Sequence, residues 1–193
     1  MGRLGWVEPK SFMQRNNELM DAYSQGKLAM EDYMAFSLEP LIGRTPEEVA
    51  HLVEPWVEDY IEPIIFSDAT KTIAAHRKAG DRILVISASG THLVKPIAER
   101  LGIDEVLGIE LEVAHGFYTG HTVGTLTYRE GKITRLLEWL DEQEENLEGA
   151  SFYSDSRNDL PLLLKVDHPH VVNPDPVLRE QAEKAGWPIH HWK

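Results

Sequence analysis

Hydrophobic and polar positions divide the chain into two halves with different periods. From Glu8 to about Glu62, apolar side chains recur at helical spacing, and no strand-like alternation interrupts them. This pattern predicts three helices, which open near Ser11, cover Met30–Phe36, and run from Thr45 to about Tyr60. The third start is the best defined, because a threonine, a proline and two glutamates follow one another as they do at capped helix starts.

From Ser67 onward, expected helices alternate with short apolar runs. The helices are predicted at Ser67–Ala79, Thr91–Leu101, Ile133–Glu144, Asp159–Leu164 and Pro176–Ala185. The strands are predicted at Arg82–Ser87, Val106–Ile109, Ser151–Ser154 and Pro169–Val172, with an antiparallel hairpin or flap over His115–Thr127. Continuous apolar strands separated by helices indicate an α/β fold, with a doubly wound, mostly parallel, Rossmann-like sheet and helices on both faces.

Composition narrows the class of protein. The 193 residues are 42% hydrophobic and 26% charged, as in a soluble globular domain, and they include no cysteine. No apolar run approaches the roughly 18 residues of a membrane span, and the first residues lack the apolar segment of a secretory signal. We therefore expect a cytoplasmic protein without a membrane span. The net charge of −13 argues against nucleic acid as a partner but admits a small phosphorylated ligand, especially beside a divalent cation.

The first candidate site follows the expected strand Arg82–Ser87. That strand ends in Ser87, Ala88 and Ser89, directly before a helix. Ligands bind beyond the carboxyl ends of parallel strands, and the backbone N–H groups of a helix start suit an anion. The same residues would also form an ordinary strand-to-helix loop in which serine caps the helix.

The second candidate site follows the expected strand Ser151–Ser154. Asp155 and Asp159 lie on either side of the turn into the next helix, with Asn158 between them. Two carboxylates at one strand end suit a hard cation such as Mg²⁺, although Asp159 could equally be a favourable charge at a helix start. Lys132 lies ahead of an amphipathic helix, where an isolated lysine is usually a surface residue.

Taken in order, Ser87, Lys132, Asp155 and Asp159 resemble the later motifs of the haloacid dehalogenase (HAD) superfamily, and most closely its phosphoserine-phosphatase-like branch. The resemblance covers nearly the whole chain. The residues that it assigns to phosphate are Ser87, Ala88, Ser89, Lys132 and Asn158, and those that it assigns to Mg²⁺ are Asp155 and Asp159. Lys132 and Ser87 would also be the catalytic residues present in the chain.

The resemblance further implies a helical cap over residues 8–64 and a HAD core over residues 65–193. The implied activity is Mg²⁺-dependent hydrolysis of a small phosphomonoester, similar to phosphoserine or histidinol phosphate, through an aspartyl-phosphate intermediate. Cap residues such as Arg15, Arg44 or Tyr23 would then meet the leaving group of the substrate.

The family also begins with a strand that ends in Asp-x-Asp, whose first aspartate attacks phosphorus. No Asp-x-Asp occurs in the 193 residues. We therefore expect that the first core strand is missing through a late start, a shortened chain or natural loss, and that catalysis is weak or absent. Unpaired edges at Ile83–Ile86 and Ser151–Ser154 would then destabilise the fold or promote a homo-oligomer.

A non-catalytic binding or interaction protein on the HAD scaffold is the alternative from a different functional class. A nicotinamide-dependent oxidoreductase is disfavoured, because no Gly-x-Gly-x-x-Gly follows an expected strand.

Overall fold

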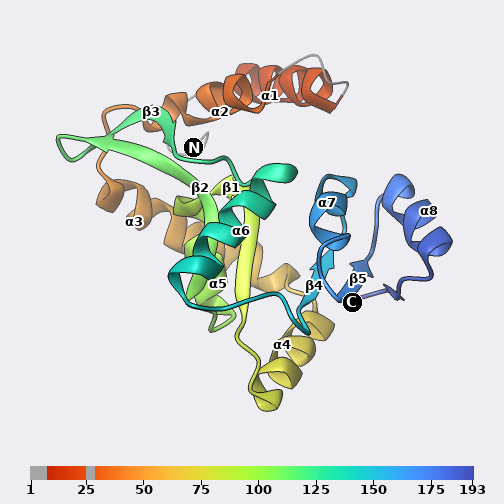
Figure 1. Cartoon of the computed structure of the whole chain (residues 1–193). Coiled ribbons are helices and arrows are strands. Elements are labelled where there is room, and N and C mark those ends of the chain that lie inside the picture. The colour runs from red at the N-terminus through yellow and green to blue at the C-terminus, as the bar shows by residue number, and fades with distance from the viewer. Residues whose placement is uncertain (1–7, 25–28) are drawn as a thin grey trace. The chain divides into compact units, whose positions relative to one another are not determined.

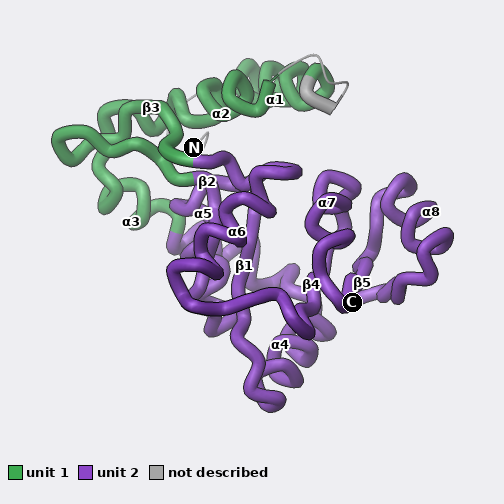
Figure 2. The backbone as a smooth tube through the Cα atoms, viewed as in Figure 1, with its two compact units in different colours: residues 1–53, 110–124 green, residues 54–109, 125–193 purple. Residues whose placement is uncertain are grey.

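The structure, a computed structural model, describes residues 8–24 and 29–193. The chain divides into two compact units, which Figure 2 colours separately. Unit 1 contains residues 1–53 and 110–124, and unit 2 contains residues 54–109 and 125–193. The cap and core boundary that the resemblance implies, between residues 64 and 65, stays a prediction. Each unit is described below by itself.

Unit 1 combines helices with the outer part of a hairpin (Figure 1). Its helices are α1 (Pro9–Ser24), α2 (Met30–Leu38), the 3₁₀ turn η2 (Glu39–Leu41) and most of α3 (Pro46–Trp56). The predicted cap of α3 is confirmed: the Glu48 N–H donates to Thr45 Oγ1 (3.1 Å), and the Thr45 N–H donates to the Glu48 carboxylate (2.9 Å). The hairpin is joined to the helices because the Gly43 N–H donates to the Tyr118 carbonyl (2.9 Å).

Unit 2 carries the alternation of strands and helices that the sequence predicts. Its helices are the π-helical turn η3 (Val57–Ile61), the 3₁₀ turns η4 (Glu62–Ile64) and η5 (Arg157–Asp159), α4 (Ser67–Ala79), α5 (Thr91–Arg100), α6 (Glu130–Glu142), α7 (Leu160–Leu163) and α8 (Pro176–Ala185). Its strands are β1 (Leu84–Gly90), the first half of β2 (Glu105–Ala114), β4 (Ser151–Ser154), β5 (His168–Val172) and β6 (Ile189–His190). α4 ends at Ala79 and is capped by Gly80, which takes up a left-handed conformation with φ of 88°.

The strands form two three-stranded sheets rather than one. The first sheet has the order β1-β2-β3, with β3 at Phe117–Val123, and the second has the order β4-β5-β6. All strand pairs are parallel except the β2–β3 hairpin. The α/β class with mostly parallel strands is therefore as predicted. In the described part of the chain, β1 and β4 are terminal strands of their sheets. A missing strand beside them stays a prediction.

The apolar core of unit 2 lies between the helices and these strands. One cluster is centred on Leu107, Leu136, Leu140 and Leu162, and includes side chains of β1, β4, α6 and α7. A second cluster packs α8 against β5. Among the described residues, no helix combines the length and the apolar character that crossing a membrane requires.

Candidate active site

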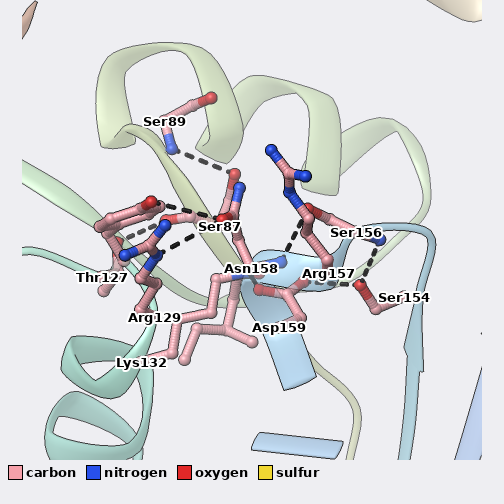
Figure 3. A network of polar contacts seen from close by, with 12 residues as sticks. Ser87, Ser89, Thr127, Arg129, Lys132, Ser154, Ser156, Arg157, Asn158 and Asp159 are labelled. Carbon is pink, nitrogen blue, oxygen red and sulfur yellow. Dashed lines mark hydrogen bonds and ion pairs between the residues drawn. The ribbon is translucent and has the colours of Figure 1, made fainter. Parts of the chain in front are cut away.

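A buried ion pair lies where β1 and β4 end (Figure 3). Lys132 Nζ, from the first turn of α6, is 2.6 Å from Asp159 Oδ1, in the turn that follows β4. Lys132 is 5% exposed and Asp159 is 8% exposed, so neither charge is solvated as it would be on the surface. The Lys132 ammonium also donates to the backbone carbonyl of Ile86 in β1 (3.4 Å). One side chain therefore contacts both β1 and the turn that follows β4.

The loop after β4 is held by a series of short-range hydrogen bonds. Ser154 Oγ donates to Asp159 Oδ2 (2.7 Å), and the Ser156 N–H donates back to Ser154 Oγ (3.1 Å). Ser156 in turn caps η5, because its hydroxyl accepts from the Asn158 N–H (3.2 Å). Serines at alternate positions thus fix the Asp159 carboxylate toward Lys132 while the chain turns from strand to helix.

Asp175 anchors this loop from the start of α8. Its carboxylate accepts from the Arg157 N–H (2.6 Å) and from the N–H groups of Val177 and Leu178 (2.8 and 3.0 Å). Partial burial raises the pKa of the Asp175 carboxyl, but the N–H groups of Leu178, Arg157 and Val177 outweigh that effect and leave the pKa below its usual value. In addition, the Asp175 N–H donates to the Asp155 carbonyl (2.9 Å). We did not predict this role from the sequence, although Asp-Pro is a recognisable helix start.

The end of β1 is fixed by the segment before α6. Thr127 is fully buried, and its hydroxyl donates to the Ser87 carbonyl. The Ser87 hydroxyl accepts from the Ser89 N–H (3.2 Å). Arg129 has a positive φ of 48°, and its Nε donates to Asn158 Oδ1 (3.5 Å), which also accepts from the Tyr128 hydroxyl (3.3 Å). Strained backbone of this kind is concentrated at functional sites.

Comparison with known families identifies the family of the chain. The family model of haloacid dehalogenase-like hydrolases matches residues 4–164. The chain belongs to this family. It is 37% identical over 193 residues to a histidinol-phosphatase of Neisseria meningitidis serogroup C, with 98% of this chain and 87% of that protein covered. It is 32% identical to phosphoserine phosphatase SerB1 of Mycobacterium tuberculosis, covering 78% of this chain but only about half (49%) of that protein.

Solved structures agree on the HAD fold. A protein of unknown function from Bordetella pertussis Tohama I has a TM-score of 0.88 and 35% identity, over 93% of this chain and 82% of that chain. A phospho-aspartyl intermediate analogue of phosphoserine phosphatase has a TM-score of 0.63 and 23% identity, over 92% of this chain and 79% of that chain. At that lower identity the likeness shows the fold alone.

The structure brings most of the predicted HAD site residues together. Lys132 and Asp159 are in direct contact. Lys132 also binds the carbonyl of Ile86, the residue before Ser87. Asn158 accepts a hydrogen bond from Tyr128, in the segment before α6. Ala88 and Ser89 continue β1 beyond Ser87; Ala88 is half-buried and Ser89 is exposed. Their roles stay predictions.

The two predicted metal ligands, Asp155 and Asp159, differ in their exposure and in their contacts. The Asp155 side chain is exposed, whereas both Asp159 oxygens already accept, one from Lys132 and the other from Ser154. In the part of the chain that is described, no group of three or more His, Cys, Asp or Glu side chains is arranged to hold a metal ion. The donor chemistry suits a hard cation, and Asp155 is the carboxylate better placed to offer it an oxygen.

Two of the predicted cap residues have local partners within unit 1. Arg15 pairs with Glu18 at 3.2 Å, and Arg44 Nε donates to the Pro40 carbonyl (3.2 Å). The side chain of Tyr23 lies outside the described part of the chain.

Proposed function

We propose that this chain acts on a small phosphorylated metabolite, of the histidinol phosphate or phosphoserine type, in the manner of a Mg²⁺-dependent phosphomonoester hydrolase. The observation that carries the proposal is the buried Lys132–Asp159 pair between the ends of β1 and β4. A buried lysine that contacts β1 and the turn after β4 offers a fixed positive charge near the edge of the sheet where parallel strands usually bind their ligands. The histidinol-phosphatase and phosphoserine phosphatase relatives support the choice of substrate class.

Lys132 and the end of β1 would together receive the phosphoryl group. The Lys132 ammonium has three donors, and Ile86 and Asp159 now accept from it. A phosphate dianion would supply a stronger acceptor in the same place, while Asp159 would keep the ammonium oriented. The Ser87 hydroxyl and the Ala88 N–H, just before α5, would complete the set of donors, and the Ser89 N–H would join them by exchanging the Ser87 hydroxyl for a phosphate oxygen.

Magnesium, when bound, would neutralise phosphate charge and orient the transferring group. Asp155 would hold the ion directly, because its carboxylate is exposed and is not committed to Lys132. Asp159 would act mainly through Lys132. Asn158, which is held by Tyr128 and Arg129, would position the loop or a phosphate oxygen.

Hydrolysis through an aspartyl-phosphate also needs an attacking carboxylate, and the 193 residues contain no Asp-x-Asp. We therefore propose that the chain of this sequence binds phosphate and turns over slowly at most. The alternative is a binding protein that uses the same pocket without chemistry. Measurable turnover supports the enzyme, whereas phosphate binding without turnover supports the binding protein.

The test combines calorimetric binding of inorganic phosphate with Mg²⁺-dependent hydrolysis of p-nitrophenyl phosphate, histidinol phosphate and phosphoserine. Lys132→Met should weaken phosphate binding by tenfold or more, as roughly expected for the loss of a charge-assisted hydrogen bond. Lys165→Met, at an exposed lysine, is the matched control and should leave binding unchanged. Asp155→Asn should remove the Mg²⁺-dependent part of binding, whereas the exposed control Asp141→Asn should not. Equal phosphate affinity in Lys132→Met and the unaltered chain would contradict the assignment.

A further inference from the structure

One face of the sheet β4-β5-β6 carries a row of imidazole side chains. Paired residues of parallel strands project to the same face of a sheet, and so do alternate residues of one strand. Tyr153 pairs with His170, and Val172 pairs with His190. Because His170 and Val172 are alternate residues of β5, the side chains of Tyr153, His170 and His190 share one face. His168, two residues before His170, belongs to the same face.

Two of these imidazoles are in direct contact. His170 Nδ1 is 3.1 Å from His190 Nε2, and the two ring centroids are 5.2 Å apart. When two histidines bind one metal ion, each nitrogen is about 2.0–2.1 Å from the ion, so two nitrogens at adjacent positions are about 2.9–3.4 Å apart. The separation of the two nitrogens therefore already matches that of two ligands on one ion.

The ring of His170 is held in place by a series of contacts that begins at α4. As a neutral imidazole, His76 donates from Nδ1 to the Asp81 carboxylate (2.7 Å) and accepts at Nε2 from the Tyr153 hydroxyl (2.8 Å). The Tyr153 ring stacks on His170, with centroids 4.5 Å apart and an angle of 8° between the ring planes. A ring that is already ordered loses little freedom when it binds an ion, so His170 is preorganised as a ligand.

The surroundings of His170 favour its uncharged form. Partial burial lowers the pKa of His170, and the nearby imidazoles of His190, His168 and His76 lower it further. The neutral imidazole is the form that binds metal ions, because its unprotonated nitrogen offers a lone pair. The net charge of −13 also favours a cation over an anion as the ligand of this face.

We propose that His170 and His190 bind a divalent transition metal ion of the Cu²⁺ or Ni²⁺ type, with water in the remaining coordination positions. Imidazole nitrogen suits these ions, whereas Mg²⁺ prefers oxygen ligands. The ion would join β6 to β5, which pair through only two residues of each strand. The inference does not depend on the proposed phosphatase activity.

The number of ligands favours Cu²⁺ or Ni²⁺ over Zn²⁺. Structural zinc sites use four protein ligands and catalytic zinc sites use three. No such set of three or more His, Cys, Asp or Glu side chains is in place among the described residues, and two histidine nitrogens stand alone at this point of the sheet. Cu²⁺ and Ni²⁺ form tetragonal sites with mixed nitrogen and oxygen ligands, which two imidazoles and water can supply.

The first experiment locates the ion in the unaltered chain. Substoichiometric Cu²⁺ is added to ¹⁵N-labelled protein, and the paramagnetic broadening of backbone amide resonances is measured by NMR. We expect His170, His190 and their neighbours in β5 and β6 to broaden first, whereas His51 and His121, two exposed histidines of unit 1, stay sharp. Broadening that is equal at His121, or absent from β5 and β6, would overturn the proposal. This result does not depend on whether any variant folds.

A pair of variants then tests the two ligands by calorimetric titration with Ni²⁺. His170→Gln and His190→Gln should each weaken Ni²⁺ binding roughly tenfold or more, since losing even an outer partner of a metal site costs about that much. His121→Gln is the matched control and should leave the affinity unchanged. An excess of Mg²⁺ should not compete with Ni²⁺, because the two nitrogens do not suit a hard cation. Unchanged Ni²⁺ affinity in either folded variant, or displacement of Ni²⁺ by Mg²⁺, would contradict the assignment.

Discussion

The buried Lys132–Asp159 pair makes a quantitative prediction about stability. Lys132→Met removes the ammonium and leaves a carboxylate that is 8% exposed, with Ser154 still donating to it. Breaking a buried pair by removing one partner costs about 3–5 kcal/mol in the free energy of unfolding. The remaining Ser154 hydrogen bond places the expected loss near the lower end, at about 3 kcal/mol.

The double variant Lys132→Met/Asp159→Leu should be less damaging than the sum of its parts. Once both charges are gone, no unpaired ion remains buried, and Phe152, whose ring centroid lies 6.0 Å from Lys132 Nζ, offers the methionine an apolar neighbour. We therefore expect a coupling energy of about 2 kcal/mol or more between the two positions.

Urea unfolding of the four proteins, followed by circular dichroism, measures this coupling. The control is the same cycle at Lys184 and Glu180, whose side chains are also 2.6 Å apart but are each 68% exposed. The control cycle should give at most about 0.5 kcal/mol. A coupling at Lys132 and Asp159 no larger than that of the control would refute the reasoning.

Two further predictions concern single residues of unit 2. Burial lowers the pKa of His92 to about 4 from 6.5, so His92 is neutral in the folded state while the unfolded chain takes up a proton below pH 6.5. The free energy of unfolding is therefore unaffected by His92 above pH 6.5 and falls as the pH drops toward 4, by about 2 kcal/mol at pH 5. Urea unfolding at pH 7 and pH 5 should show this loss, and His92→Leu should abolish it. Gly131→Ala should destabilise the protein by about 2 kcal/mol or more, because an added Cβ would overlap the Leu126 carbonyl. The control is Gly149→Ala, whose added Cβ meets no atom and which should cost only about 1 kcal/mol for its left-handed backbone. Thermal unfolding of the two variants checks that difference, and equal losses would contradict it.

Local signals predicted the helices and strands well. The spans Ser67–Ala79, Ser151–Ser154 and Pro176–Ala185 agree with the structure residue for residue, because each has a strong start or stop signal beside a clear apolar pattern. β6 was not predicted, since a strand of two residues after a proline has no period to detect. β2 runs on to Ala114, well past the predicted end at Ile109, because its outer half is stabilised by pairing with β3.

The environment of Lys132 could not be predicted from its own neighbours. We placed it just before a helix that begins at Ile133, whereas α6 begins at Glu130 and includes Lys132 in its first turn. The isolated residue suggested a surface lysine, but the structure buries it against Asp159 and the Ile86 carbonyl. Those partners are 27 and 46 residues away in sequence. The family resemblance supplied what local patterns could not.

The site and the apolar cavity lined by Leu84, Leu136 and Phe152 share α6, and this makes their geometries interdependent. The first turn of α6 places Lys132 against β1 and the turn after β4, and its next turns place Leu136 and Leu140 in the core between β1 and β4. No backbone ladder between β1 and β4 is present among the described residues. Side chains of α6 contact both sides: Lys132 binds the Ile86 carbonyl, and Leu136 belongs to the apolar cluster that Phe152 packs against. A change that shifts α6 would therefore move the Lys132 ammonium relative to Ile86 and Asp159. On this basis, filling the cavity through Leu136→Trp should weaken phosphate binding at Lys132, whereas Leu137→Trp, at an exposed residue of α6, should leave it unchanged.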